Sequence, residues 1–231
     1  MQAYVNYIVV GNQSWSQNIY NQIISKYSGN WCFIQSKENF NIESIDAISP
    51  RYIFFLHWSF KVPDEIINNY ECVCFHMTDV PYGRGGSPLQ NLIIRGHQHT
   101  KLTALRMTQE FDAGAAYCKE DLSLIGNAEE IYIRATYLSA QMIKDIIQKE
   151  PEPIDQSGEI TIFKRRKPTE SEIPELDSLP KLYDFIRMLD AEGYPHAYIE
   201  HQGFKYSFRR SVLYDGQIIA DVTITPVGEK E

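Results

Sequence analysis

The fold of this chain is decided by the stretch Cys72-Val-Cys-Phe-His-Met-Thr-Asp-Val-Pro-Tyr-Gly-Arg-Gly-Gly-Ser-Pro-Leu-Gln-Asn91. It opens with an apolar run, residues 72–76, whose length and composition are typical of a strand. The glycines and prolines that follow indicate a loop, and Pro88 stands where the first turn of a helix tolerates proline best. The stretch therefore predicts a strand, a loop and a helix in succession.

The same alternation extends to both sides of this stretch. We predict strands at residues 3–10, 31–35, 52–56 and 102–107, and helices at 14–28, 64–69, 87–94 and 128–149. The run at 52–56 is continuously apolar, as are strands that lie buried on both faces of a parallel sheet. The pattern predicts an α/β fold around a mainly parallel sheet.

The composition changes at residues 149–158, Lys-Glu-Pro-Glu-Pro-Ile-Asp-Gln-Ser-Gly. This segment is charged, contains proline and has no periodicity, as is usual for a linker. We therefore predict a larger domain over residues 1–155 and a smaller one over 156–231. The smaller domain should be α+β or rich in β-structure, with a strand at 160–163, a helix at 179–191 and alternating strands between 197 and 224.

The overall charge and apolar pattern argue against several classes of partner. The chain has 22 Lys and Arg against 30 Asp and Glu, a net charge of −8, which would repel a polyphosphate. We therefore predict no nucleic-acid partner. No apolar run approaches the roughly 20 residues of a membrane span, and the first residues lack the basic region of a signal peptide. We expect a cytoplasmic protein without a membrane partner, in which the four cysteines are reduced thiols.

His76 is the strongest candidate for a functional residue. It ends a predicted strand, and ligands of open parallel sheets bind at the carboxyl ends of strands. Cys72, Cys74 and His76 share one face, because side chains two apart on a strand project together. Three interpretations compete: a core histidine above buried cysteines, a metal site, and general acid/base catalysis. Positions two apart are about 7 Å from each other, so we predict no metal. Acid/base work would need a carboxylate, and Asp112 is the candidate.

Taken together, these segments resemble the folate-dependent formyltransferases, a family that includes glycinamide ribonucleotide, methionyl-tRNA and nucleotide-sugar N-formyltransferases. The family motif is N-x-H-x-S, then L-P-x-x-R-G-x-x-P and later D-x-G. The matching residues are His76, Thr78, Val80-Pro81, Arg84-Gly85, Pro88 and Asp112-Ala113-Gly114. Residues 182–198 are also similar to the C-terminal domain of the tRNA and sugar enzymes. The resemblance implies a Rossmann-like formyltransferase domain followed by a small C-terminal domain.

The resemblance also implies a reaction and its residues. The formyl donor would be N10-formyltetrahydrofolate, and an amine would receive the formyl group. His76 would accept the amine proton, while Asp112 would orient His76 and raise its basicity. The implied catalytic residues are His76, Asp112, Cys74 and Thr78. The implied co-substrate residues are Trp58, Phe60, Lys61, Gln109, Glu110 and Phe111, and the implied substrate loop holds Arg84, Gly85, Gly86 and Gln90.

The chain departs from the family motif at Cys74, which stands where the family has asparagine. In the family that asparagine is thought to hold the formyl oxygen, and a thiol is a much weaker donor than an amide. Two alternatives follow. Another donor replaces the amide, with the imidazolium, Thr78, Gln90 or Asn91 as candidates, or the chain is a catalytically silent module that binds folate or a nucleotide sugar.

The net charge and the presence of a C-terminal domain bear on which amine receives the formyl group. The negative net charge argues for a small substrate rather than tRNA. The C-terminal extension excludes the glycinamide-type layout. By elimination we predict an amino sugar carried on a nucleotide, as in polysaccharide biosynthesis, with methionyl-tRNA as the enzymatic alternative. A homodimer is one oligomeric state that the sequence leaves open.

Overall fold

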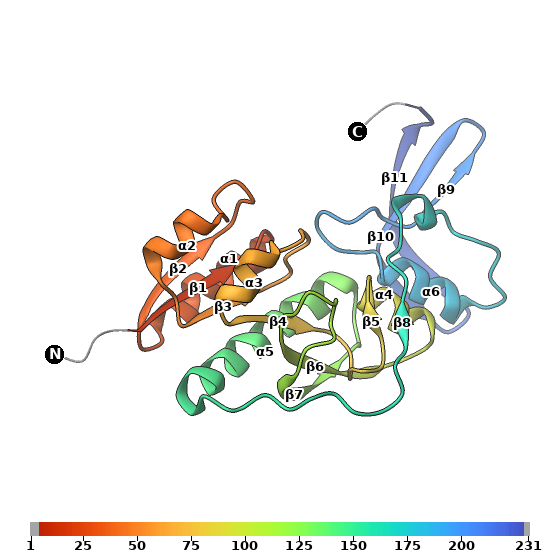
Figure 1. Cartoon of the computed structure of the whole chain (residues 1–231). Coiled ribbons are helices and arrows are strands. Elements are labelled where there is room, and N and C mark those ends of the chain that lie inside the picture. Colours follow the sequence, from red (N-terminus) through yellow and green to blue (C-terminus); the bar gives the residue numbers. More distant parts are fainter. Residues whose placement is uncertain (1–4, 229–231) are drawn as a thin grey trace. The chain divides into compact units, whose positions relative to one another are not determined.

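The computed structural model describes residues 5–228 of the chain (Figure 1). These residues form two compact units, each built from segments that are not consecutive in sequence. The first unit contains residues 5–85, 101–122 and 133–162, and the second contains residues 86–100, 123–132 and 163–228. The predicted sequence boundary after residue 155 stays a prediction.

A six-stranded sheet with the order β2-β1-β3-β4-β6-β7 organises the first unit. Its strands are β1 (Asn6–Val10), β2 (Asn30–Ile34), β3 (Tyr52–Phe55), β4 (Cys72–His76), β6 (His99–Arg106) and β7 (Ala116–Ser123). β1 pairs in parallel with β2 and β3, and β3 pairs in parallel with β4. Among the pairings of this sheet with a described register, only that of β4 with β6 is antiparallel. The mostly parallel sheet confirms the predicted fold class.

Helices occupy the connections between the strands, and most of them are predicted from the sequence. They are α1 (Ser14–Gln22), the short 3₁₀ helix η1 (Ile24–Lys26), α2 (Ile42–Ile48), α3 (Asp64–Asn69), α4 (Pro88–Ile94) and α5 (Ala128–Lys149). The predicted helix at 14–28 is therefore split, because α1 ends at Gln22 and only η1 follows. Every residue of β3 is buried, which explains its continuous apolar run. Within the described residues, no helix is both long and apolar enough to cross a bilayer.

Two elements of the first unit are absent from the sequence-based prediction. β7 carries three exposed charged residues, 119–121, in the middle of the strand, and its place at the edge of the sheet allows that exposure. α2 is only seven residues long, and its start depends on the Asn41 side chain, which accepts a hydrogen bond from the Ser44 amide at 2.9 Å. The prediction relied on hydrophobic periodicity, which the charges of β7 interrupt and which α2 is too short to display.

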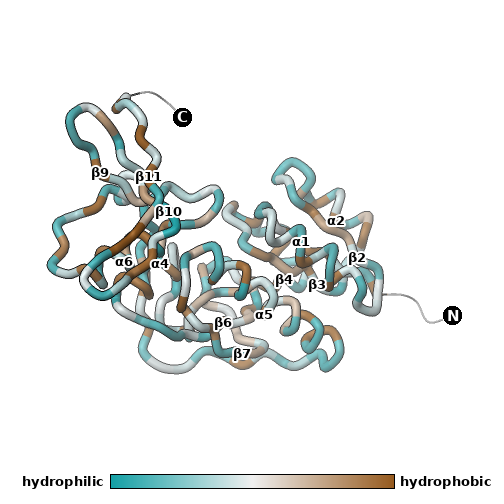
Figure 2. The backbone as a smooth tube through the Cα atoms, turned by 180° about the vertical axis from the view of Figure 1, so that it is seen from behind, coloured by the Kyte–Doolittle hydropathy of each residue, from teal (hydrophilic) through white to brown (hydrophobic). Residues whose placement is uncertain are grey.

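The second unit contains a three-stranded antiparallel sheet and a helix. The elements are the 3₁₀ helix η2 (Pro168–Ser171), α6 (Leu179–Arg187), β9 (Tyr198–His201), β10 (Phe204–Tyr214) and β11 (Gln217–Pro226). The strands turn at Gly203 and Gly216, where the sequence predicts breaks, and both glycines have positive φ angles. Figure 2 shows hydrophobic stretches along this sheet, and Ile219, Val222 and Ile224 on β11 are exposed.

The segment after α5, of which residues 149–158 are predicted to be a linker, contacts the first unit at several points. We call residues 154–162 the strap; Figure 1 shows the chain running from the end of α5 past β7 to β8 (Ile162–Phe163), which pairs with β5 (Arg84–Gly85). Ile154 forms an antiparallel bridge with Ala116. The Thr161 carbonyl accepts hydrogen bonds from the amides of Gly83 and Arg84, both at 3.0 Å.

Candidate active site

The carboxyl end of β4 positions His76. In the register of the sheet, His76 pairs with Thr103 on β6, and Cys74 lies between Phe55 on β3 and Leu105 on β6. The His76 side chain is only 7% exposed. The structure therefore places His76 at the end of an interior strand, where the sequence predicts it.

Both ring nitrogens of His76 face an acceptor. Nε2 lies 2.8 Å from the Gly83 carbonyl oxygen, and Nδ1 lies 3.4 Å from Asp112 Oδ1. A carbonyl oxygen can only accept, so Nε2 carries a hydrogen and donates it. In the neutral ring Nδ1 is then the nitrogen with a free lone pair. The geometry makes Nδ1, on the Asp112 side, the atom that can gain or lose a proton.

The Gly83 carbonyl is itself held in place. Thr78 Oγ1 donates to it at 3.3 Å, and Thr103 Oγ1 donates to the Thr78 carbonyl at 2.7 Å. The Gly83 amide donates to the Thr161 carbonyl of the strap. Gly83 has a φ of 75°, a conformation that glycine adopts without steric cost. The glycine-rich loop after β4 thus presents a fixed acceptor to Nε2.

Asp112 is held at its carboxylate and at its backbone. Oδ2 accepts the Gly85 amide at 2.9 Å, which leaves Oδ1 toward His76. Gln156 Nε2 donates to the carbonyls of Asp112 and Gly114, both at 2.8 Å. A Cβ on Gly114 would overlap the Arg106 carbonyl oxygen, so the glycine of the D-x-G motif permits close packing of this turn.

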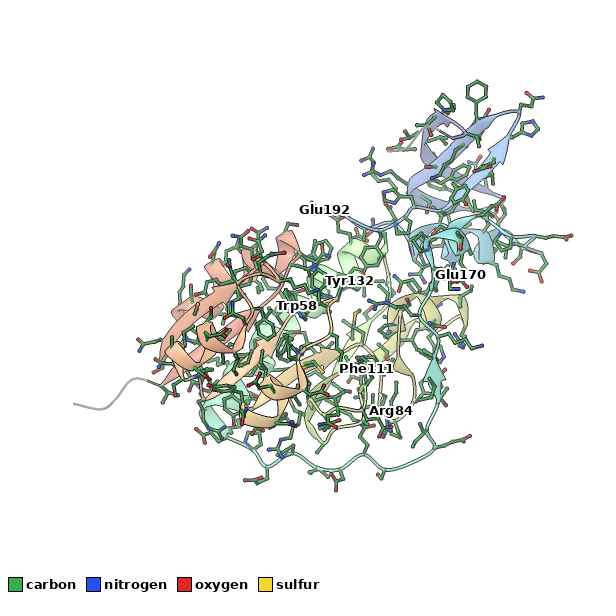
Figure 3. The ribbon with its side chains drawn as sticks, turned by 45° about the horizontal axis from the view of Figure 1, so that its top comes forward. Trp58, Arg84, Phe111, Tyr132, Glu170 and Glu192 are labelled. Atoms are coloured by element: carbon green, nitrogen blue, oxygen red, sulfur yellow. The ribbon has the colours of Figure 1, made fainter. Side chains whose placement is uncertain are left out.

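A cavity of about 200 Å³ opens beside the His76–Asp112 pair. It is lined by Cys74, by His76 and Asp112, and by five of the six predicted co-substrate residues, Trp58, Phe60, Lys61, Gln109 and Phe111. Figure 3 labels Trp58 and Phe111, which come from different segments, and the Phe111 side chain is 71% exposed. The sixth residue, Glu110, lines a shallow neighbouring depression, and its carboxylate lies 3.7 Å from Arg84 Nη1. The structure thus brings most of the predicted site together.

Cys74 is a neutral thiol in this setting. Burial raises the pKa of Cys74 well above its ordinary value, and the nearby Asp112 carboxylate raises it further. Burial also raises the pKa of Cys72, to about 12. Neither sulfur is poised to be a thiolate nucleophile. Within the described residues, no group of three His, Cys, Asp or Glu side chains is arranged to hold a metal ion.

The predicted substrate loop divides between the two units. Arg84 and Gly85 lie in the first unit; Arg84 Nε donates to Gln156 Oε1 at 3.0 Å, and the Gly85 amide holds Asp112. Gly86 and Gln90 belong to the second unit. The Gln90 amide is 3% exposed and donates to Tyr132 Oη and the Met188 carbonyl, so internal hydrogen bonds occupy it.

The sequence-based prediction missed Gln156, Thr161 and Thr103. Gln156 lies in the segment predicted to be a linker, and Thr161 acts through its backbone, which no side-chain pattern reports. Thr103 falls in an apolar predicted strand and is completely buried. The sequence marks it only as a polar residue in a largely apolar strand.

Comparisons with known proteins find similarity to formyltransferases. Residues 168–225 match the family model described as the methionyl-tRNA formyltransferase C-terminal domain. A solved methionyl-tRNA formyltransferase from Clostridium thermocellum is 45% identical, covers 96% of this chain and 99% of its own, and superposes with a TM-score of 0.91. The methionyl-tRNA formyltransferase of Rickettsia massiliae is 28% identical over 69% of this chain and 55% of its own length. This chain thus spans about half the length of such curated relatives.

A more distant likeness concerns the fold alone. A solved sugar N-formyltransferase from a Shewanella species is 15% identical, with a TM-score of 0.63, and the match covers 97% of this chain and 99% of that one.

The similarity to methionyl-tRNA formyltransferases overturns one prediction: the exclusion of a nucleic-acid partner is wrong. A net charge of −8 sums over the whole chain, whereas binding to a polyphosphate depends on the charges that lie near it.

Proposed function

The chain belongs to the folate-dependent formyltransferase family, and from this premise we propose that it transfers a formyl group from N10-formyltetrahydrofolate to the amino group of methionyl-tRNA. One observation carries the proposal: His76 Nδ1 faces Asp112 Oδ1 at 3.4 Å at the wall of a cavity, with Nε2 fixed by Gly83. The 45% identity to the Clostridium thermocellum enzyme supports tRNA as the acceptor. The predicted amino-sugar acceptor has weaker support, from a relative of 15% identity.

The cavity suits the flat, polar-edged ring system of a folate. Its walls include the rings of Trp58, Phe60 and Phe111, which can pack against a heteroaromatic face. Among the described residues, the buried Trp58 Nε1 has no hydrogen-bond acceptor, so a donor is available at this wall. The folate would supply the formyl group. Trp58 to Lys61 on one side and Gln109 with Phe111 on the other would hold it.

The proposed chemistry of the chain is proton transfer at one ring nitrogen. His76 Nδ1 accepts the proton that the attacking amine loses, since Nε2–H is committed to the Gly83 carbonyl. Asp112 Oδ1 stabilises the resulting imidazolium from the same side. The Gly85 amide prevents the carboxylate from turning away. Asp112 thus acts at the reacting nitrogen, and the orienting acceptor on the other nitrogen is a backbone carbonyl.

Cys74 lines the cavity in the place of the family's asparagine and offers only a weak S–H donor. Of the substitutes considered from the sequence, Thr78 donates to Gly83 and the Gln90 amide is used internally. Asn91 Nδ2 likewise donates to backbone carbonyls. The imidazolium of His76 directs its two N–H groups at Gly83 and Asp112, so it offers positive charge and no free N–H. We therefore assign to that positive charge the electrostatic stabilisation of the formyl oxygen.

The test is a transfer assay with three acceptors offered separately: methionyl-tRNA, free methionine and an amino-sugar nucleotide. We expect N-formylmethionine after hydrolysis of the tRNA product and none with free methionine. The His76→Ala variant is the negative control. Transfer only to the amino-sugar nucleotide would move the proposal to that acceptor. If no acceptor is formylated while folate still raises the melting temperature, the chain is a silent binding module.

A further inference from the structure

Gln156 is the one strap side chain with described hydrogen bonds to the Asp112 turn. Its Nε2 donates to the carbonyls of Asp112 and Gly114, both at 2.8 Å, and its Oε1 accepts from Arg84 Nε at 3.0 Å. Both amide hydrogens and the amide oxygen are thus in use. The amide joins the turn that carries Asp112 to the strand that follows the His76 loop.

The strap also reaches the other side of the histidine. The Thr161 carbonyl accepts the amides of Gly83 and Arg84, and the Thr161 amide donates to the Pro81 carbonyl at 3.2 Å. Gly83 is the residue whose carbonyl faces His76 Nε2. One segment therefore supports the acceptors of both ring nitrogens: Gly83 through the strap backbone, and Asp112 through the Gln156 side chain.

The arrangement at Asp112 is sensitive to small movements. The distance of 3.4 Å between Nδ1 and Oδ1 already exceeds an ordinary hydrogen bond. The Asp112 backbone has a φ of 54°, in the sparsely populated left-handed region, which aspartate tolerates better than most residues. The two Gln156 bonds are the contacts that fix the carbonyls on each side of this turn.

We propose that Gln156 is a positioning residue for the proposed reaction, because it holds Asp112 against Nδ1 of His76. An amide is required at this position because it can donate to the two carbonyls and accept from Arg84 at the same time. Glutamate has the same shape and still accepts from Arg84, but it places a charged acceptor opposite two carbonyls and donates to neither. The inference rests on the proposed function only for its rate readout, since the position of Asp112 can be observed without turnover.

The first measurement is made on the full chain without ligands. Ring ¹⁵N chemical shifts of His76, assigned by their loss in His76→Ala, report the environment of each nitrogen. In Gln156→Glu we expect the Nδ1 signal to shift and the Nε2 signal, set by Gly83, to stay. Gln156→Met, of similar length and without charge, should give the same pattern. The exposed neighbour Asp155, changed to Asn, is the matched control and should leave both signals unchanged.

The second measurement is single-turnover formyl transfer with the acceptor that the parent uses. We expect Gln156→Glu and Gln156→Met to lower the rate about 10- to 100-fold, since a misplacement of about 1 Å can cost about 10²-fold. The acceptor concentration that gives half of the maximal single-turnover rate should stay unchanged. An unshifted Nδ1 signal in both folded variants overturns the proposal, whatever the rate. If the parent transfers no formyl group, the NMR comparison still decides the role of Gln156.

Discussion

Two segments support the His76–Asp112 pair, and they differ in how their sequences encode that role. The loop after β4, residues 77–85, contains Pro81, Gly83 and Gly85 together with motif side chains. The strap, residues 154–162, contains no motif; it spans the end of the predicted linker at 149–158 and the start of the predicted strand at 160–163. Yet both segments hold Gly83: Thr78 Oγ1 of the loop donates to the Gly83 carbonyl, and the Gly83 amide donates to the Thr161 carbonyl of the strap.

The difference lies in what each segment contributes. The loop acts through residues suited by conformation and chemistry: a glycine at positive φ, whose carbonyl faces His76, and a threonine hydroxyl. The strap acts mainly through backbone groups, which every sequence possesses, and through one amide side chain. A motif therefore identifies the reacting groups, while part of their support comes from a segment that carries no motif.

Removing the reacting groups should have the largest effect. We expect His76→Ala and Asp112→Asn each to lower the single-turnover rate by about 10² to 10⁴, the usual contribution of positioned proton transfer. The melting temperature should change little, because neither change removes a hydrophobic contact of the core. A residual rate above about a tenth of the parent in either variant would argue against the assignment.

A change in the strap backbone should have an intermediate effect. Thr161→Pro removes the amide that donates to the buried Pro81 carbonyl, so we expect the free energy of unfolding to fall by about 1–3 kcal/mol. Thr161→Val keeps the amide and should change stability by no more than about 0.5 kcal/mol. Urea denaturation measures both. Equal losses in the two variants would mean that the strap works through its side chain instead.

The smallest expected effect is a gain at Cys74. Cys74→Asn restores an amide donor to the cavity wall, and we expect formyl transfer to rise about 10-fold, equivalent to about 1.4 kcal/mol of transition-state stabilisation. Cys74→Ala should be nearly silent, because the raised pKa of the thiol gives it no role as a thiolate. If Asn lowers the rate and Ala abolishes it, the thiol has a chemical role and the mechanism is wrong.

The parts of the fold that sequence predicts are those with local causes. β3 and β4 follow from apolar runs, and the turns at Gly203 and Gly216 follow from residues that favour positive φ. The antiparallel direction of β6 does not follow, because a connection of residues 77–98 permits either direction. β7 escapes detection since its exposed charges suit an edge strand and imitate a loop.

The residues of the candidate site also differ in whether the sequence reveals them. His76 is found from its residue type and its place at a strand end, and Asp112 from the resemblance to the family motif; Nδ1 and Oδ1 of the two lie 3.4 Å apart. Gln156 is separated from Asp112 by 44 positions, and its partners are carbonyls, which leave no trace in the sequence. The net charge misled the prediction of partners because it averages over the whole chain and does not report local charge.

The left-handed backbone of Asp112 also has a consequence for mutational tolerance. With a φ of 54°, position 112 favours aspartate, asparagine or glycine, because larger and branched side chains are strained there. Asparagine keeps the conformation without the charge, and glutamate keeps the charge without the conformation. Selection for folding alone would therefore admit three residues at this position. Selection for a carboxylate at the histidine admits one of them.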